Sequence, residues 1–273
     1  MIVVTGSAGY IGEELCNSLL AKGENIIQID SKFNKRAEEY ITDNIEFFRN
    51  AKYIVHLAAI SGIQACQDNL KEATISNVIA TQHIMKFAAD YSIPMIFASS
   101  AAANNPHSSF YATTKFLGER TAKYYNENYD ARITTLRFSN VFGGEKYLEK
   151  KNSVVAKFLK ARENEDKIII DGDGEQTRDF IHVKRIIEVI DHLIENNYIP
   201  SKKYDVCSGH TYSVNDIAKL IGNTNVEYKN DKTFGVLSSE GETADMWILM
   251  GTDWSKKQNT DILQYINKTL EQF

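Results

Sequence analysis

Residues 2–12 read Ile-Val-Val-Thr-Gly-Ser-Ala-Gly-Tyr-Ile-Gly, and residues 13–22 continue with good helix formers that have one apolar side. The apolar start indicates a short buried strand, and the glycines then form a turn that leads into a helix. Gly6 permits the tight turn, Gly9 lets the backbone approach a pyrophosphate, and Gly12 lets helix and strand pack closely. N–H groups and the helix dipole favour an anion at this N-terminus. The stretch therefore predicts a dinucleotide-binding turn.

A carboxylate follows the second predicted strand. Residues 25–29 are mostly apolar and lead into Asp30, which lies 18 residues beyond Gly12. An acid about 20 residues beyond the glycine motif binds the hydroxyls of the adenosine ribose. It would repel a 2′-phosphate, so the spacing favours NAD over NADP. Basic residues just downstream keep NADP open as an alternative: Lys32, Lys35 and Arg36.

Composition bounds the class of protein. The 273 residues are 43% hydrophobic and 25% charged, with a formal net charge of −5, which fits one large domain or one domain with a lobe. The mild negative charge argues against nucleic-acid binding, and no apolar run reaches the roughly 20 residues of a membrane span. Three scattered cysteines predict neither a disulfide framework nor a metal site, which fits a cytoplasmic protein. Because the first strand follows Met1 directly, we expect no signal peptide.

Strands and helices alternate through the first half of the chain. Apolar strands are predicted over residues 53–59 and 94–100, with a helical pattern over residues 77–91 between them. This alternation predicts a doubly wound parallel sheet, the Rossmann type of α/β fold. Ligands of such sheets bind at the carboxyl ends of the strands, which is where Ser99 and Ser100 stand.

Tyr111 and Lys115 open the next predicted helix and share one of its faces, because they are four residues apart. An ammonium beside a phenol, with a cationic nicotinamide ring nearby, stabilises the phenolate. The pair therefore predicts a tyrosine pKa lowered from about 10 toward neutrality, as a general base requires. An isolated YxxxK match is more often two surface residues on a helix. The glycine turn, Asp30 and Ser100 favour the catalytic interpretation.

Segments along most of the chain share their pattern with one family: TGSAGYIG (5–12), HLAA (56–59), Asn77-Val78 with Thr81, FASS (97–100), YATTK (111–115), LRFSNVFG (136–143) and GDGEQTRDFIHV (172–183). On these segments the chain resembles the extended short-chain dehydrogenase/reductases, specifically the NAD-dependent nucleotide-sugar epimerases and dehydratases. The resemblance implies an NAD-binding Rossmann domain (residues 1–140 with 166–206). It also implies a small C-terminal α/β substrate-binding lobe (residues 141–165 with 207–273) and a homodimer.

The resemblance assigns roles to the residues of the dinucleotide-binding half. Tyr111 would be the acid/base, Ser100 would hydrogen-bond the reacting hydroxyl, and Lys115 would bind the nicotinamide ribose. The remaining cofactor contacts would come from the glycine turn and from the ends of the next strands: Gly6, Gly9, Tyr10, Ile11, Gly12, Asp30, Leu57, Ala58, Ala59 and Asn77.

Three further residues would bind the nucleotide of the substrate. By the same resemblance, Asn140 and Arg178 would contact the diphosphate and Glu242 the ribose, since a guanidinium fork suits phosphate oxygens. Alternatives stay open for two of them. Asn140 could cap a turn, and Arg178 could pair with Asp173 or Glu175 in a β-hairpin that the Asp-Gly turns imply.

One departure from the family discriminates between reactions. Sugar-nucleotide 4,6-dehydratases carry an Asp-Glu pair just after the catalytic hydroxyl residue, whereas Ala101 and Ala102 follow Ser100 here. The resemblance therefore implies C4 epimerisation of a UDP-hexose through a 4-keto intermediate. A reductase, decarboxylase or dehydratase on the same fold and a non-catalytic NAD-binding relative stay open as alternatives.

Overall fold

The computed structural model describes residues 1–33, 36–144, 146–150, 153–222, 225–229, 238–239, 241–251, 254 and 261–272. The chain divides into two compact units, Met1–Arg137 with Ile187–Tyr204 and Phe138–Ile186 with Asp205–Phe273. None of the helices in the described ranges has both the length and the apolar character needed to span a membrane.

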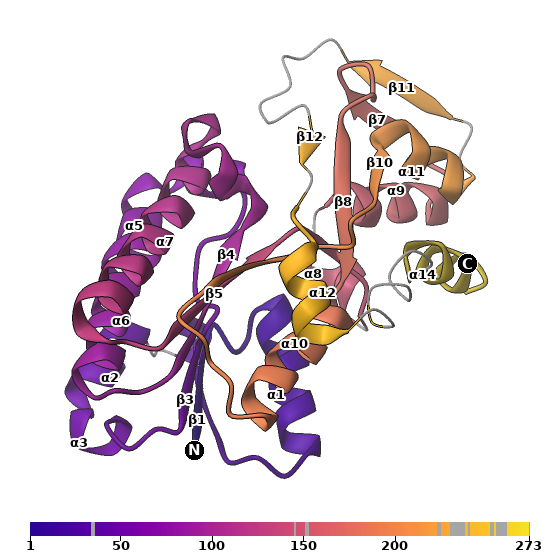
Figure 1. Ribbon diagram of the computed structural model, residues 1–273. Coiled ribbons are helices and arrows are strands. Elements are labelled where there is room, and N and C mark those ends of the chain that lie inside the picture. Colours follow the sequence, from indigo (N-terminus) through magenta and orange to yellow (C-terminus); the bar gives the residue numbers. More distant parts are fainter. Residues whose placement is uncertain are drawn as a thin grey trace. The chain divides into compact units, whose positions relative to one another are not determined.

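Figure 1 labels the helices and strands along the chain. In chain order they are β1 (Ile2–Thr5), α1 (Tyr10–Ala21), β2 (Ile26–Ile29), η1 (Ser31–Phe33), α2 (Ala37–Asp43), α3 (Ile45–Phe48), β3 (Tyr53–His56), α4 (Ile63–Asp68), α5 (Leu70–Thr74), η2 (Ile75–Ile79), α6 (Ala80–Asp90), β4 (Met95–Ser100), η3 (Ala101–Asn104), η4 (Pro106–Ser108), α7 (Phe110–Tyr129), β5 (Ile133–Phe138), β6 (Asn140–Phe142), α8 (Tyr147–Lys150), α9 (Val154–Glu163), β7 (Ile168–Asp171), β8 (Thr177–His182), α10 (Val183–Glu195), β9 (Lys203–Val206), β10 (Thr211–Ser213), α11 (Val214–Ile221), β11 (Val226–Lys229), β12 (Ser238–Ser239), α12 (Ala244–Met250) and α14 (Asp261–Leu270).

The main sheet has the strand order β2-β1-β3-β4-β5-β9. Strands β1 to β4 pair in parallel, and the side chains of β1 and β3 are buried throughout because helices cover both faces of the sheet (Figure 1). The chain moves outward from β1 to β2 and then crosses back to β3. The strand order therefore reverses beside β1, which is the position where folds of this type bind ligands. The predicted doubly wound Rossmann fold is confirmed.

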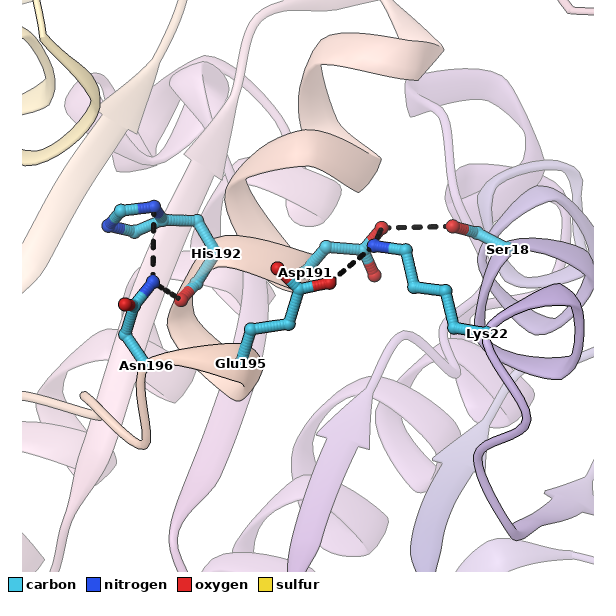
Figure 2. Close-up of polar contacts among 6 residues, drawn as sticks. All are labelled: Ser18, Lys22, Asp191, His192, Glu195 and Asn196. Carbon is cyan, nitrogen blue, oxygen red and sulfur yellow. Dashed lines mark hydrogen bonds and ion pairs between the residues drawn. The ribbon is translucent and has the colours of Figure 1, made fainter.

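Polar side chains join α1 to α10 on one face of this sheet, as Figure 2 shows. Lys22 Nζ lies 2.6 Å from Asp191 Oδ2 and 2.7 Å from Glu195 Oε1. The Ser18 hydroxyl donates a further hydrogen bond to Asp191 Oδ2 at 2.9 Å. These contacts attach the C-terminal end of α1 to α10.

The second unit is organised around β8, which pairs with β6, β10 and β12. Strand β7 pairs instead with β11 in a separate two-stranded sheet, so the hairpin expected from the Asp-Gly turns before β8 is wrong. These pairings also explain the unit boundary. The family resemblance implies residues 166–206 in the dinucleotide-binding domain, whereas residues 166–186 lie in the second unit, where β8 pairs with β6 and β10.

Candidate active site

The glycine turn between β1 and α1 is sterically specific. Gly6 has a φ of +70°, and its N–H donates to the Ile29 carbonyl at 2.8 Å. A Cβ on Gly12 would lie 2.1 Å from the Gly6 carbonyl oxygen, so only glycine lets the helix start this close to the strand. The helix cap is Gly9, which has no side chain to occupy the N-terminus. The turn therefore presents a helix N-terminus suited to an anion.

Two polar groups line the same turn. The Ser7 hydroxyl is buried and has no hydrogen-bond partner among the described residues. Asp30 Oδ2 accepts the N–H of Ala8 at 3.0 Å, and Oδ1 accepts the N–H of Lys32 at 2.9 Å. Backbone groups thus hold the Asp30 carboxylate beside the glycine turn.

Two of the three basic residues that left NADP open have separate partners. Lys32 Nζ approaches the Ala8 carbonyl oxygen at 3.4 Å, and Arg36 pairs with Glu38 and Glu72, each at 3.3 Å. Lys35 lies outside the described residues.

The segment after β3 is held by side chains from other elements. The Leu57 N–H donates to the Thr5 carbonyl at 3.1 Å. The Asn77 amide accepts the Ile60 N–H at 2.8 Å and donates to the Ile60 carbonyl at 3.0 Å. Asn77 lies in η2, a π-helical segment that the sequence does not predict. Because π-helical turns occur frequently at functional sites, this segment indicates a functional region independently of any sequence motif.

His56 ends β3 but is engaged within the core. Its two ring nitrogens lie 2.7 Å from Thr5 Oγ1 and 3.0 Å from Thr81 Oγ1. Burial, helped by the charge of Lys115, lowers the pKa of His56 to about 3. The imidazole is therefore neutral and structural at physiological pH.

Tyr111 and Lys115 lie in the first turns of α7, beside the end of β4. Lys115 Nζ donates to the Ala98 carbonyl at 2.8 Å and lies 6.0 Å from the centroid of the Tyr111 ring. Burial lowers the pKa of Lys115 to about 8. The Ser100 hydroxyl accepts the Ala102 N–H at 3.2 Å and also hydrogen-bonds Tyr111. The three residues that the motifs single out are thus brought together.

The protonation state of Tyr111 in the protein alone is set by burial. Burial raises the pKa of Tyr111 to about 12, and the hydrogen bond with Ser100 offsets only part of this rise. The residue is partly exposed, but its surroundings desolvate the phenol. The Lys115 ammonium points to a backbone carbonyl and does not compensate. In the protein alone the phenol is therefore protonated at neutral pH, and the predicted lowering, which includes a nearby cationic nicotinamide ring, stays a prediction for the cofactor-bound state.

The candidate residues of the second unit lie on and beside β8. Asn140 Nδ2 donates to the Asp179 carbonyl at 3.0 Å, which ties β6 to β8. Arg178 Nη1 donates to the Thr177 carbonyl at 2.7 Å, and burial lowers the pKa of Arg178. Glu242 is exposed, and its N–H donates to Asp205 Oδ2 at 3.1 Å. Asn140 and Arg178 therefore lie on paired strands, and Glu242 follows a third strand, β12, that pairs beside Arg178.

Sequence reasoning misses one group near Ser100. Glu119 on α7 and Arg137 on β5 form a buried ion pair with two hydrogen bonds of 2.6 Å. The only sequence signal is that Glu119 lies one helical turn beyond Lys115. Within the described ranges, no group of three or more His, Cys, Asp or Glu residues could hold a metal ion.

Comparisons with known proteins fit this geometry. The model of the NAD dependent epimerase/dehydratase family matches residues 2–207. A protein of Methanocaldococcus jannaschii, provisionally named as a UDP-glucose 4-epimerase, is 28% identical over 251 residues, which cover 81% of each chain.

Solved structures show the same fold. The UDP-glucose 4-epimerase of Thermotoga maritima, solved with UDP-glucose, matches with a TM-score of 0.84 at 22% identity over 99% of this chain and 97% of that one. An NAD-dependent NDP-hexosamine 5,6-dehydratase of tunicamycin biosynthesis, TunA, also gives 0.84, at 21% identity over 99% and 96% of the two chains. Epimerases and a dehydratase therefore share this fold.

Proposed function

The chain belongs to the NAD dependent epimerase/dehydratase family, and from this membership we propose that it inverts C4 of a UDP-hexose. At the coarser level it is an enzyme of the nucleotide-sugar epimerase/dehydratase family, and its cofactor is NAD. The observation that supports the proposal most strongly is the contact of Ser100 with Tyr111 next to Lys115, in the unit that carries the glycine turn.

The residues of the first unit fit NAD. A Cβ on Gly12 would close the turn onto the Gly6 carbonyl, and Asp30 is held beside that turn by the backbone. The buried Ser7 hydroxyl adds a polar group in the same place. We propose that the turn binds the pyrophosphate and Asp30 the adenosine ribose. Bound NAD supplies reversible hydride acceptance, which is the redox chemistry of the reaction.

The remaining cofactor contacts are part of the same proposal. Tyr10 and Ile11 supply N–H groups at the start of α1, and Leu57, Ala58 and Ala59 border the dinucleotide where β3 ends. Asn77 fixes that border through Ile60. Lys115 binds the nicotinamide ribose.

Tyr111 is the proton carrier in this scheme. It removes the proton of the C4 hydroxyl during oxidation and returns a proton after the 4-keto sugar has turned in the pocket. Ser100 hydrogen-bonds the reacting oxygen, and Lys115 binds the nicotinamide ribose next to it. Because the Tyr111 pKa is about 12 in the protein alone, the scheme requires added positive charge beside the phenol, which the oxidised cofactor carries.

The residues after Ser100 favour epimerisation over elimination. Ala101 to Asn104 form the short helix η3, which contains three alanines and no carboxylate. Loss of water needs an acid and a base beside the leaving hydroxyl, whereas C4 inversion needs one proton carrier and reversible hydride transfer. Because the residues after Ser100 lack the carboxylates that could serve as this acid and base, they favour inversion at C4 over loss of water.

The second unit carries the proposed substrate contacts. We propose that Asn140 and Arg178 bind the diphosphate of the nucleotide sugar and that Glu242 binds its ribose. The proposal also includes a cytoplasmic location and a homodimer formed through helices near residues 78–91 and 112–126. Apolar side chains exposed along those helices support the dimer: Ile79, Leu117 and Tyr124.

Turnover of defined sugars tests the proposal. Purified protein with NAD is incubated separately with UDP-glucose, UDP-galactose and their N-acetyl forms, and NMR follows interconversion at C4. Tyr111→Phe, which should bind NAD like the wild type, is the matched control. Net consumption of NADH, or release of carbon dioxide from a UDP-uronate, would instead indicate a reductase or a decarboxylase, respectively. If no sugar is inverted while NAD binds normally, the epimerase proposal is rejected.

A further inference from the structure

A buried ion pair lies next to the proposed catalytic residues without belonging to them. Arg137 Nε and Nη2 donate to Glu119 Oε1 and Oε2, each at 2.6 Å, and both side chains are 9% exposed. Burying two charges has a desolvation cost that their attraction offsets only when further hydrogen bonds satisfy the remaining polar atoms. The partners that provide those bonds therefore indicate what the pair holds in place.

Those partners lie on both sides of Ser100. The Ser99 hydroxyl donates to Glu119 Oε1 at 2.6 Å, and Arg137 Nη1 donates to Asn104 Oδ1. Ser99 immediately precedes Ser100 at the end of β4, and Asn104 ends the short helix η3 that Ser100 begins. One ion pair thus anchors the backbone before and after the proposed catalytic serine.

The pair also acts on Lys115. Glu119 lies four residues beyond Lys115 and shares its face of α7. Burial lowers the Lys115 pKa, and Cys66 and then Glu119 oppose this lowering. The other titratable groups facing Lys115 are Tyr111 of the same helix, Cys66 of α4 and His56 of β3. Tyr111 and His56 are neutral at pH 7, and burial raises the pKa of the Cys66 thiol, so that thiol stays protonated as well. Glu119 is therefore the carboxylate that supports the Lys115 ammonium.

We propose that Glu119 and Arg137 are positioning residues: their ion pair fixes the backbone around Ser100 and keeps a negative charge beside Lys115. The role rests on the proposed function, because it matters for turnover only if Ser100 and Lys115 take part. It goes beyond packing, since a pair that only stabilised the fold would leave the pH dependence of cofactor binding unchanged.

Ser99→Ala tests the link to Ser100 and leaves both charges of the pair in place. We expect this variant to lower kcat about tenfold with KM nearly unchanged, because a misplaced hydroxyl weakens the reaction more than binding. In a Ser100→Ala background the same change should lower kcat less than about twofold, because the Ser100 hydroxyl that would be positioned is absent. Equal effects in both backgrounds would overturn the positioning role. Asn104→Ala, measured in the wild type and in the Ser100→Ala background, gives the same test from the other side of Ser100.

Glu119→Gln tests the link to Lys115 through NAD affinity measured against pH by calorimetry. NAD binding should weaken as pH rises through the Lys115 pKa, and the variant should move this midpoint down by about one pH unit. Glu127→Gln is the matched control, because Glu127 pairs with Lys123 at 3.5 Å on the exposed side of the same helix. The control should keep the wild-type midpoint.

The two experiments separate this inference from the proposed function. If the wild type inverts no sugar, the proposed function fails, and the NAD titrations still decide the role of Glu119. If Glu119→Gln and Glu127→Gln give the same midpoint, the inference is wrong even when the enzyme is active. Should Glu119→Gln not fold, the Ser99 cycle decides the inference, because that variant does not unpair a buried charge.

Discussion

Each unit of the chain contains a buried arginine–carboxylate pair with two hydrogen bonds, but the two pairs fix different parts of the chain. In the first unit, Glu119 and Arg137 add bonds to the segments on both sides of Ser100. In the second unit, Arg185 donates to Asp261 at 2.7 and 3.0 Å, and Asp261 is the first residue of the terminal helix α14. The chemistry of the pairs is the same, so their neighbours determine whether breaking one changes turnover or only stability.

The largest effect is expected at Tyr111, the proposed proton carrier in the unit of the first pair. Tyr111→Phe removes one hydroxyl from a phenol next to Ser100 and should lower kcat about 10⁴-fold, or about 5 kcal/mol of transition-state stabilisation. Interconversion of UDP-hexoses by NMR measures the loss. NAD affinity and thermal stability should stay near those of the wild type. A Phe variant that retains a tenth of the activity would remove Tyr111 from the mechanism.

Arg185→Met breaks the pair of the second unit. It leaves Asp261 buried without its main partner, and the free energy of unfolding should fall by about 3–4 kcal/mol. Denaturant unfolding measures the loss, and NAD affinity of the folded protein should not change. The matched control is Lys184→Met, since Lys184 reaches the same carboxylate at 3.2 Å but is about half exposed. That control should cost less than about 1 kcal/mol. If Arg185→Met and Lys184→Met lost equal free energy of unfolding, Arg185 would not be the residue that attaches α14.

Two histidines, the buried His56 in the first unit and the half-buried His182 in the second, predict how stability depends on pH. Burial lowers the pKa of His182 from 6.5 to about 4, with help from Lys184, and burial lowers that of His56 to about 3. Below pH 6.5 the unfolded chain binds protons that the folded chain does not. Stability is therefore complete above pH 6.5 and falls as pH falls toward 4.

The His182→Gln variant isolates the contribution of the second unit. Between pH 6.5 and 4 it should remove about 2–3 kcal/mol of the pH-dependent loss of stability. Chemical denaturation at several pH values measures this. A variant whose stability falls as steeply with pH as that of the wild type would show that His182 is not held neutral.

The smallest effect is expected at the contact of Figure 2. Lys22 is 41% exposed, although it lies 2.6 Å from Asp191. Lys22→Met should cost less than about 1 kcal/mol, because solvent screens the pair, and the cost should shrink in high salt. Unfolding in low and high salt measures both. A loss of unfolding free energy as large as that of Arg185→Met would mean that solvent exposure does not determine how much these ion pairs stabilise the protein.

Features encoded in short stretches of sequence could be predicted. The glycine turn, Asp30, the strand ends and the Tyr111–Lys115 pair depend on neighbouring residues along one element, and the structure places each near its expected position. The helix start at Ser213 is local in the same way, because the Ser213 hydroxyl and the Asp216 carboxylate, three residues apart, form a capping box.

Features that depend on distant contacts could not be predicted. Glu119 and Arg137 are 18 residues apart on a helix and a strand, and their pairing depends on how α7 packs against β5. The pKa of Tyr111 is set by desolvation, which the motif does not encode. Residues 166–186 join the second unit because β8 pairs with β6, β10 and β12, and such pairing is not visible in the strand itself.

In the proposed reaction, C4 is inverted by hydride that leaves and returns within one active site. UDP-glucose labelled with deuterium at C4 tests this directly, with NMR and mass spectrometry of the product. We expect UDP-galactose that retains deuterium at C4, with no net change in NAD. Product carrying solvent hydrogen at C4, or no product from a protein with NAD bound, would contradict it.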